Sequence, residues 1–141
     1  MLPVSEELGE LPKLVKILDE ELVIFRDKSG QVGLLDKHCS HRGASLEYGI
    51  VADCGLVCSY HGWHFDIDGT LLKAGSEPCK SPVHKRVKHG AYQTYEYEGI
   101  IFAYLGPPEK TPEFPLYDTQ TNNDLLKVPF TIETPCNWLQ V

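Results

Sequence analysis

The chain has 141 residues, of which 42% are hydrophobic, and carries a formal net charge of −7 at pH 7. This length suits one domain, or one domain with a fragment of a second, and the apolar content is sufficient for an ordinary packed core. The acidic balance argues against nucleic acid or an anionic membrane as the partner. No apolar run approaches membrane-spanning length, and the first residues lack the features of a signal peptide. Five cysteines, an odd number, without an export signal predict a reducing compartment, so we expect a cytoplasmic protein.

Short apolar segments separated by turn signals occupy the first hundred residues. Nine of them are expected to form strands: 14–18, 22–26, 32–36, 48–51, 56–58, 64–66, 70–72, 92–97 and 100–105. Turn-forming residues, such as those at 27–30 and 66–69, separate consecutive segments. No window of useful length shows a sustained helical period. Many short strands at regular spacing predict an all-β sandwich or barrel.

The composition changes after Gly106. Prolines at 107, 108, 112 and 115, followed by the polar run 118–124, predict an extended connector. A further apolar strand is expected at 125–132, and the chain then ends with Cys136-Asn137-Trp138-Leu139-Gln140-Val141.

Four residues have the spacing of metal ligands. Cys39 and His41 are followed, after a gap of 16 residues, by Cys58 and His61. Two thiolates and two imidazoles are the ligand set of a Rieske [2Fe–2S] centre, in which two His replace two Cys on one of the irons. A structural zinc also accepts two Cys and two His. Zinc fingers usually pair Cys with Cys and His with His, so the mixed pairs favour iron–sulfur over the zinc alternative.

The motif C-x-H-x16-C-x-x-H-G-W resembles that of the Rieske family. This resemblance implies that Cys39 and Cys58 hold one iron and that His41 and His61 hold the other. It also implies an antiparallel β-sandwich with a small cluster-binding β subdomain, whose loops lie at about residues 38–66. The remaining cysteines, Cys54, Cys79 and Cys136, are expected to be free, half-buried thiols.

The resemblance also indicates the potential class. High-potential Rieske proteins carry a disulfide between two further loop cysteines, and this chain has Ala44 and Tyr60 at those positions. They also place Ser and Tyr, which donate hydrogen bonds to the cluster sulfurs, where this chain has Trp63 and Phe65. The low-potential class, comprising oxygenase domains and soluble Rieske ferredoxins, is therefore expected.

Three segments resemble Rieske non-haem iron oxygenases, particularly the phthalate-dioxygenase-like branch: 41–46, 60–66 and the terminal Asn-Trp-Leu-Gln. The resemblance implies a Rieske domain at 1–106, and at 107–141 a connector with the first segment of a truncated catalytic domain. A reductase or ferredoxin would supply electrons, which the cluster would pass to a mononuclear Fe(II) in a homotrimer for O2-dependent hydroxylation. Ligands of that iron are expected beyond Val141, so this chain alone would hydroxylate nothing.

Two alternatives stay open at this point. The chain could be a stand-alone low-potential Rieske ferredoxin with a dispensable tail, or a zinc-stabilised interaction module that binds no sulfide.

A basic run follows the metal motif. Lys80, Lys85, Arg86 and Lys88 occur with no acidic residue between Lys80 and His89. Such a run is usually a solvated surface. The alternative interpretation is a docking surface for an acidic redox partner, because complementary fields steer encounter.

The charge of a Rieske cluster predicts how its potential depends on pH. Two ferric ions, two sulfides and two thiolates sum to zero, because neutral imidazoles add no charge. Reduction makes this cluster negative and should favour proton uptake at the outer ring nitrogens of the two ligand imidazoles. We therefore expect the reduction potential to fall with rising pH once these imidazoles deprotonate, as measured by redox titration. A potential that stays constant into strongly alkaline solution would contradict this prediction.

Overall fold

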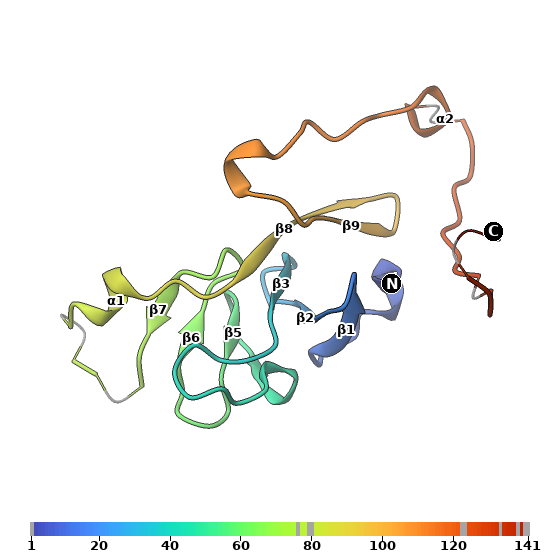
Figure 1. The fold of residues 1–141 in the computed structure, drawn as a ribbon. Coiled ribbons are helices and arrows are strands. Elements are labelled where there is room, and N and C mark those ends of the chain that lie inside the picture. The colour runs from blue at the N-terminus through green and yellow to red at the C-terminus, as the bar shows by residue number, and fades with distance from the viewer. Residues whose placement is uncertain are drawn as a thin grey trace.

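Two antiparallel sheets form the fold (Figure 1). The computed structural model describes residues 2–75, 77–78, 81–121, 124–132, 134–137 and 139. The larger sheet has the order β1-β2-β3-β8-β9, with β1 (Lys13–Ile17), β2 (Glu20–Arg26), β3 (Val32–Asp36), β8 (Ala91–Tyr97) and β9 (Ile100–Tyr104). The smaller sheet has the order β4-β5-β6-β7, with β4 (Ile50–Val51), β5 (Leu56–Val57), β6 (His64–Phe65) and β7 (Leu71–Lys73).

The small sheet is inserted between two neighbouring strands of the large one. The chain leaves β3, forms β4 to β7, and returns as β8, where Leu34 pairs with Tyr92 and Leu35 with Ala91. Short helical turns lie outside the sheets: η1 (Ser5–Glu7), η2 (Leu46–Tyr48), α1 (Val83–Arg86), η3 (Pro108–Lys110) and α2 (Asp118–Thr121). The predicted all-β antiparallel architecture with a small second sheet is therefore confirmed.

Two-residue turns connect the hairpins at the edges of the large sheet. Leu18 and Asp19 join β1 to β2 with φ of 47° and 71°, and Glu98 and Gly99 join β8 to β9 with φ of 49° and 76°. Positive φ at both central positions is the type I′ pattern, whose twist matches that of the flanking strands. The sequence predicted that the first strand ends at Leu18, whereas in the structure Leu18 is already the first residue of the turn.

The predicted strand at 125–132 is wrong. The described residues of this segment form no strand, and Pro129 in its middle has no N–H to donate to a ladder. The segment instead touches the β8–β9 turn, where Lys127 lies 3.2 Å from Glu98. The connector also differs from the prediction, since α2 is a helical turn within the part expected to be extended. An apolar run forms a strand only where a sheet edge can receive it.

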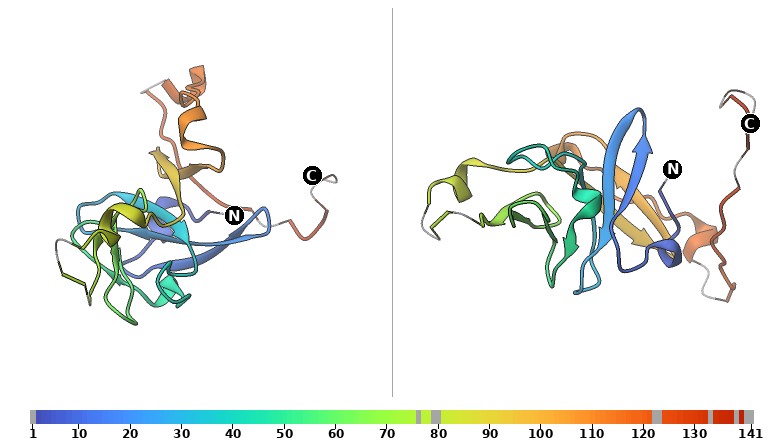
Figure 2. Two further views of the ribbon diagram at one scale, coloured as in Figure 1. Left: turned by 60° about the vertical axis from the view of Figure 1, so that its left-hand side comes forward. Right: turned by 90° about the horizontal axis from the view of Figure 1, so that it is seen from below.

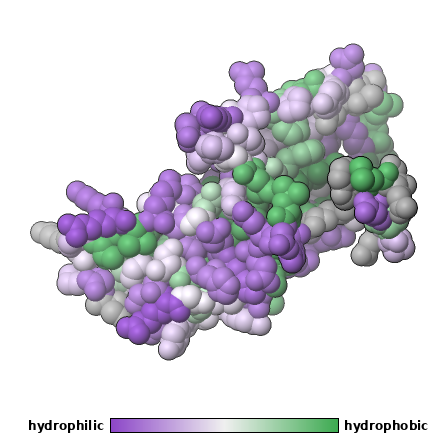
Figure 3. Space-filling model, in the orientation of Figure 1, coloured by the Kyte–Doolittle hydropathy of each residue, from purple (hydrophilic) through white to green (hydrophobic). Residues whose placement is uncertain are grey.

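The chain after β9 extends away from both sheets before it returns to the β8–β9 turn (Figures 1 and 2). Large apolar side chains along it are more than half exposed: Leu116, Tyr117, Leu125, Leu126, Val128, Phe130, Ile132 and Leu139. Figure 3 shows hydrophobic surface around the β8–β9 hairpin and this segment. No helix in the described part of the chain combines the length and apolar character needed to cross a membrane.

The two faces of β2 contribute to different cores. Val23 and Phe25 pack between the sheets in a cluster that also contains Cys39 and Cys58. On the opposite face of the large sheet, Leu22 and Ile24 pack in a second cluster with Leu8, Val15, Val32, Leu34 and Ile101. Because alternate residues of a strand point to opposite faces, one strand supports both cores. The predicted thiolates therefore start from the core that joins the two sheets.

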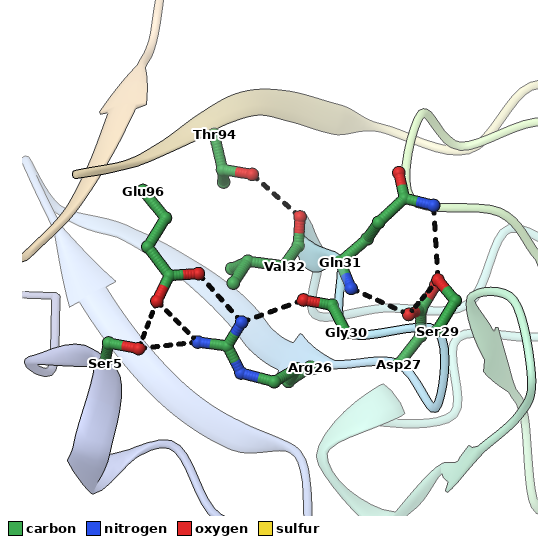
Figure 4. Close-up of polar contacts among 9 residues, drawn as sticks. All are labelled: Ser5, Arg26, Asp27, Ser29, Gly30, Gln31, Val32, Thr94 and Glu96. Carbon is green, nitrogen blue, oxygen red and sulfur yellow. Dashed lines mark hydrogen bonds and ion pairs between the residues drawn. The ribbon is translucent and has the colours of Figure 1, made fainter. Parts of the chain in front are cut away.

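Arg26, at the end of β2, ties the β8–β9 hairpin to the rest of the large sheet (Figure 4). Its Nη1 donates to Glu96 Oε2 on β8 at 2.8 Å, and its Nη2 donates to Ser5 Oγ at 2.7 Å. Thr94 Oγ1 also donates to the carbonyl of Val32 at 2.7 Å. These contacts reinforce the short pairing between β3 and β8. The hydrogen bonds from Arg26 and Ser5 also hold the pKa of Glu96 below its usual range.

Asp27 connects the turns of the two sheets. Its carboxylate accepts hydrogen bonds from Ser29 Oγ at 2.7 Å and from the N–H groups of Gln31 at 2.9 Å and Gly55 at 3.2 Å. Gly55 lies in the β4–β5 turn, and its N–H reaches across from the small sheet. Burial opposes ionisation of Asp27, but the hydrogen bonds outweigh it and hold its pKa below the usual value.

We predict that Asp27→Asn lowers the free energy of unfolding by about 1–3 kcal/mol at neutral pH, because a buried donor loses its acceptor. A depressed folded-state pKa stabilises the fold above the ordinary value of 3.8, and this stabilisation is lost as pH falls through the folded-state pKa. The difference between variant and wild type should therefore shrink in acid. Urea unfolding between pH 3 and 7 measures this, with the exposed Asp53→Asn as control. An equal loss at every pH would contradict the prediction.

Candidate metal centre

The first cluster loop begins at Cys39 and ends at Ala44. The N–H of Cys39 donates to the carbonyl of Ala44 at 2.9 Å, and the N–H of Gly43 donates to the carbonyl of Cys39 at 2.8 Å. A β-bridge between His38 and Ser45 closes the loop at its base.

The second cluster loop, from Cys58 to Trp63, has the same backbone plan. The N–H of Cys58 donates to the carbonyl of Trp63 at 2.7 Å, and the N–H of Gly62 donates to the carbonyl of Cys58 at 2.9 Å. The pairing of Val57 with His64 closes its base, as the bridge does in the first loop. Two segments of different sequence thus form equivalent loops, each beginning with a cysteine.

A glycine in the left-handed region shapes each loop. Gly43 has φ of 71° and Gly62 has φ of 69°, at the fourth position after the respective cysteine. A side chain at such a φ is strained, because Cβ approaches the following carbonyl. The histidines differ in place: His41 is the second residue after its cysteine and His61 the third. Equivalent loops therefore carry their imidazoles at non-equivalent positions.

The two thiols are buried next to each other. Cys39 is 3% exposed and Cys58 is 2% exposed. Burial and the neighbouring Cys58 raise the pKa of the Cys39 thiol to about 11, although backbone N–H groups of His41 and Arg42 favour the thiolate. Two adjacent thiolates in an apolar core require a cation to neutralise them, and a metal ion removes the proton from a coordinating thiol. This donor set fits a metal.

The two imidazoles are half-buried, whereas the thiols are fully buried. The rings of His41 and His61 lie 4.7 Å apart between centroids, at an angle of 74°. The His41 ring stacks on Trp63 at 4.6 Å with the planes 4° apart, and Tyr60 contacts His61 at 3.8 Å. Burial lowers the pKa of His41, and the neighbouring His61 and Arg42 act in the same direction. This favours the neutral imidazole, which is the form that binds a metal.

The four predicted ligands therefore lie together as an inner thiol pair and an outer imidazole pair. No three metal-binding side chains in the described ranges are arranged to hold one ion. A Rieske cluster does not require such an arrangement, because it takes two protein ligands at each of two irons. The assignment of these four residues as ligands stays a prediction.

The two flanking histidines have backbone partners. Nδ1 of His38 lies 3.1 Å from the carbonyl of Gly43, and Nε2 of His64 lies 2.5 Å from the carbonyl of Cys54. Cys54 and Cys136 are free, as expected, but exposed where half-buried thiols were predicted. Cys79 lies outside the described residues.

Sequence reasoning missed two residues at this site. His89 is 3% exposed, and its ring contacts Ser40, between two of the predicted ligands. Gly75 lies so close to the second loop that a Cβ there would be 2.2 Å from the carbonyl oxygen of His61. Neither residue belongs to the motif, and no local pattern in the sequence indicates either contact.

Comparisons with known proteins identify the family of this chain. The family model described as Rieske [2Fe-2S] domain matches residues 2–96. The oxygenase subunit of tert-butanol monooxygenase / tert-amyl alcohol desaturase from Aquincola tertiaricarbonis is 49% identical over 138 residues, which are 97% of this chain and 29% of the relative. The phthalate 4,5-dioxygenase oxygenase subunit from Pseudomonas putida is 41% identical over 139 residues, covering 98% of this chain and 31% of the relative.

A solved structure of dicamba monooxygenase bound to dicamba matches with a TM-score of 0.73 and 27% identity, over 86% of this chain and 39% of that chain. The chain spans less than a third of the length of the tert-butanol monooxygenase subunit and of the phthalate 4,5-dioxygenase subunit.

We predict that Gly75→Ala weakens the site by displacing the second loop, because its methyl group would overlap the carbonyl of His61. Iron bound per chain and the thermal midpoint should both fall. Gly9→Ala is the matched control, because a Cβ at Gly9 meets no atom within 4 Å. Unchanged metal content in the Gly75 variant would show that the second loop tolerates the displacement.

Proposed function

Because the chain belongs to the family of Rieske [2Fe–2S] domains, we propose that it relays single electrons through a cluster bound by four residues of its two equivalent loops. Cys39 and Cys58 would bind the inner iron, and His41 and His61 the outer iron. The observation that carries this assignment is the burial of both thiols beside a pair of half-buried imidazoles. When bound, the cluster supplies a one-electron redox couple.

The residues around the site provide its environment. The core between the sheets excludes water from the two thiol sulfurs, and the N–H groups of His41 and Arg42 direct positive dipoles at Cys39. Hydrogen bonds to a ligand sulfur raise the reduction potential, whereas burial away from water opposes any gain in charge. Trp63 is 6% exposed and fixes the plane of the His41 ring by stacking. Because the two imidazoles are only half-buried, a redox partner would exchange electrons with the cluster from the side of the outer iron.

For the whole protein we propose an oxygenase component. Residues 1–106 would be its Rieske domain, and residues 107–141 a connector with the first segment of a catalytic domain. A reductase or ferredoxin would supply electrons, and a mononuclear Fe(II) in the catalytic domain of a homotrimer would receive them for O2-dependent hydroxylation. Support comes from relatives described as oxygenase subunits and from the exposed apolar side chains after residue 115, which a further domain could cover. The exposed free thiols suit the cytoplasm.

Cluster analysis tests the proposed function. Anaerobically purified protein should contain about two irons and two acid-labile sulfides per chain and give a Rieske-type EPR signal after reduction with dithionite. Cys58→Ser should abolish the signal, because it replaces a buried ligand. Cys54→Ser should retain it, because Cys54 is an exposed free thiol a few residues away. A colourless protein that holds zinc and no sulfide would reject the iron–sulfur assignment.

We also infer where the electron donor docks. Helix α1 lies after Gly75, which touches the second loop. Val83, the first residue of the helix, and Val87, the residue after it, pack against the core that contains Cys39 and Cys58. Three exposed basic residues lie in this region: Lys85, Arg86 and Lys88, of which Lys88 lies 3.8 Å from Asp68. Lys80, the fourth residue of the basic run, lies outside the described residues. In a chain of net charge −7, this local excess suits an acidic redox partner.

Charge reversal tests the docking surface. The triple change of Lys85, Arg86 and Lys88 to Glu should slow reduction by the physiological donor at least about tenfold at low salt, because it removes electrostatic steering. The difference should shrink as salt screens the charges. The matched control reverses three exposed lysines elsewhere, Lys13, Lys28 and Lys110. Equal rates for the two triple variants would reject this surface.

A further inference from the structure

His89 is a buried histidine, and both nitrogens of its ring have hydrogen-bond partners. One nitrogen contacts the first cluster loop, and the other contacts the strand that leads to this loop. Nε2 lies 2.9 Å from the carbonyl oxygen of Asp36, the last residue of β3. Nδ1 lies 2.6 Å from Oγ of Ser40, the residue between Cys39 and His41. Because the carbonyl of Asp36 can only accept, Nε2 carries the proton and Nδ1 accepts from the Ser40 hydroxyl. Burial lowers the pKa of His89, which supports this neutral form.

The ring is also held from the side of the second loop. It stacks on Phe65, two residues after that loop ends, at 4.6 Å and 28°. The N–H of His89 donates to the carbonyl of Gly69 at 2.8 Å, and a Cβ at Gly69 would lie 2.1 Å from the carbonyl oxygen of His89. The neighbouring Gly90 accepts the N–H of Asp36 at 2.9 Å. His89 is therefore fixed at the junction of β3, β8 and the small sheet.

We propose that His89 is a positioning residue that orients the first cluster loop through the Ser40 hydroxyl and thereby tunes the cluster. The inference rests on the proposed function. The peptide that follows Ser40 carries the N–H of His41, and the next peptide carries the N–H of Arg42; both N–H groups are directed at the Cys39 sulfur. A shift of Ser40 therefore changes the hydrogen bonding of a ligand sulfur, and weaker N–H···S bonds lower the reduction potential.

The contact is specific to the first loop. Ser59 is the residue after Cys58, so it occupies in the second loop the place that Ser40 occupies in the first. Both serines are exposed, but the hydroxyl of Ser40 contacts the buried His89. Ser59 in the second loop therefore serves as the matched control for Ser40 in the first loop.

Ser40→Ala is the test variant, because it removes the hydroxyl and leaves the His89 ring in place. We expect a lower reduction potential, a shift in EPR g values, and release of iron to a chelator about fivefold faster, which corresponds to about 1 kcal/mol for one hydrogen bond. Ser40→Thr should restore wild-type behaviour because it keeps the hydroxyl, and Ser59→Ala should match wild type. His89→Phe retains a ring against Phe65, and combining it with Ser40→Ala should add nothing further.

The outcomes separate this inference from the proposed function. Wild-type protein without a [2Fe–2S] cluster would overturn both. A wild-type cluster together with unchanged potential, g values and iron release in Ser40→Ala would overturn the role of His89 alone, even if the thermal midpoint fell. Should His89→Phe fail to fold, the comparison of Ser40→Ala with Ser40→Thr and Ser59→Ala decides the question.

Discussion

The burial of Cys39 beside Cys58 in the core between the two sheets is the constraint on which the site depends. Each thiol begins one loop, and both are almost fully removed from water. Two ionised sulfurs at such a place would repel each other without a cation, and burial and the neighbouring Cys58 raise the pKa of the Cys39 thiol. A metal that displaces the thiol protons would couple the two loops directly. Binding of the proposed cluster would therefore be linked energetically to the packing of the small sheet on the large one.

The topology explains how a small sheet of short strands can hold such a site. Its strands are two or three residues long, and a sheet of this size is marginal by itself. It is inserted between β3 and β8, so its two ends are anchored by adjacent strands of the larger sheet. Asp27 joins the turns of the two sheets at one point, and His89 joins β3 and β6 at another. Polar contacts at the rim thus complement the apolar packing between the sheets.

Local chemistry predicted much of the fold because hairpins are local structures. Turn residues and short apolar runs identified nine strands, with boundaries that differ from the observed ones by at most two residues. Segment 125–132 shows the limit of this reasoning. Its apolar side chains satisfy a strand pattern, yet Pro129 interrupts hydrogen bonding and the segment lies beside the β8–β9 hairpin without forming a strand there. Its apolar character suits contact with another part of the protein as well as it suits a strand.

The sequence by itself determined the types and spacing of the four predicted ligands, because one cysteine and one histidine lie within each short loop. It also determined the glycines that such loops require, since a positive φ is a local demand. Only the tertiary structure decided that the loops are equivalent, that the thiols face the core and the imidazoles its edge, and that Gly75 and His89 support them. These contacts join residues far apart in the chain, and their closeness depends on how the sheets pack, which no local pattern encodes.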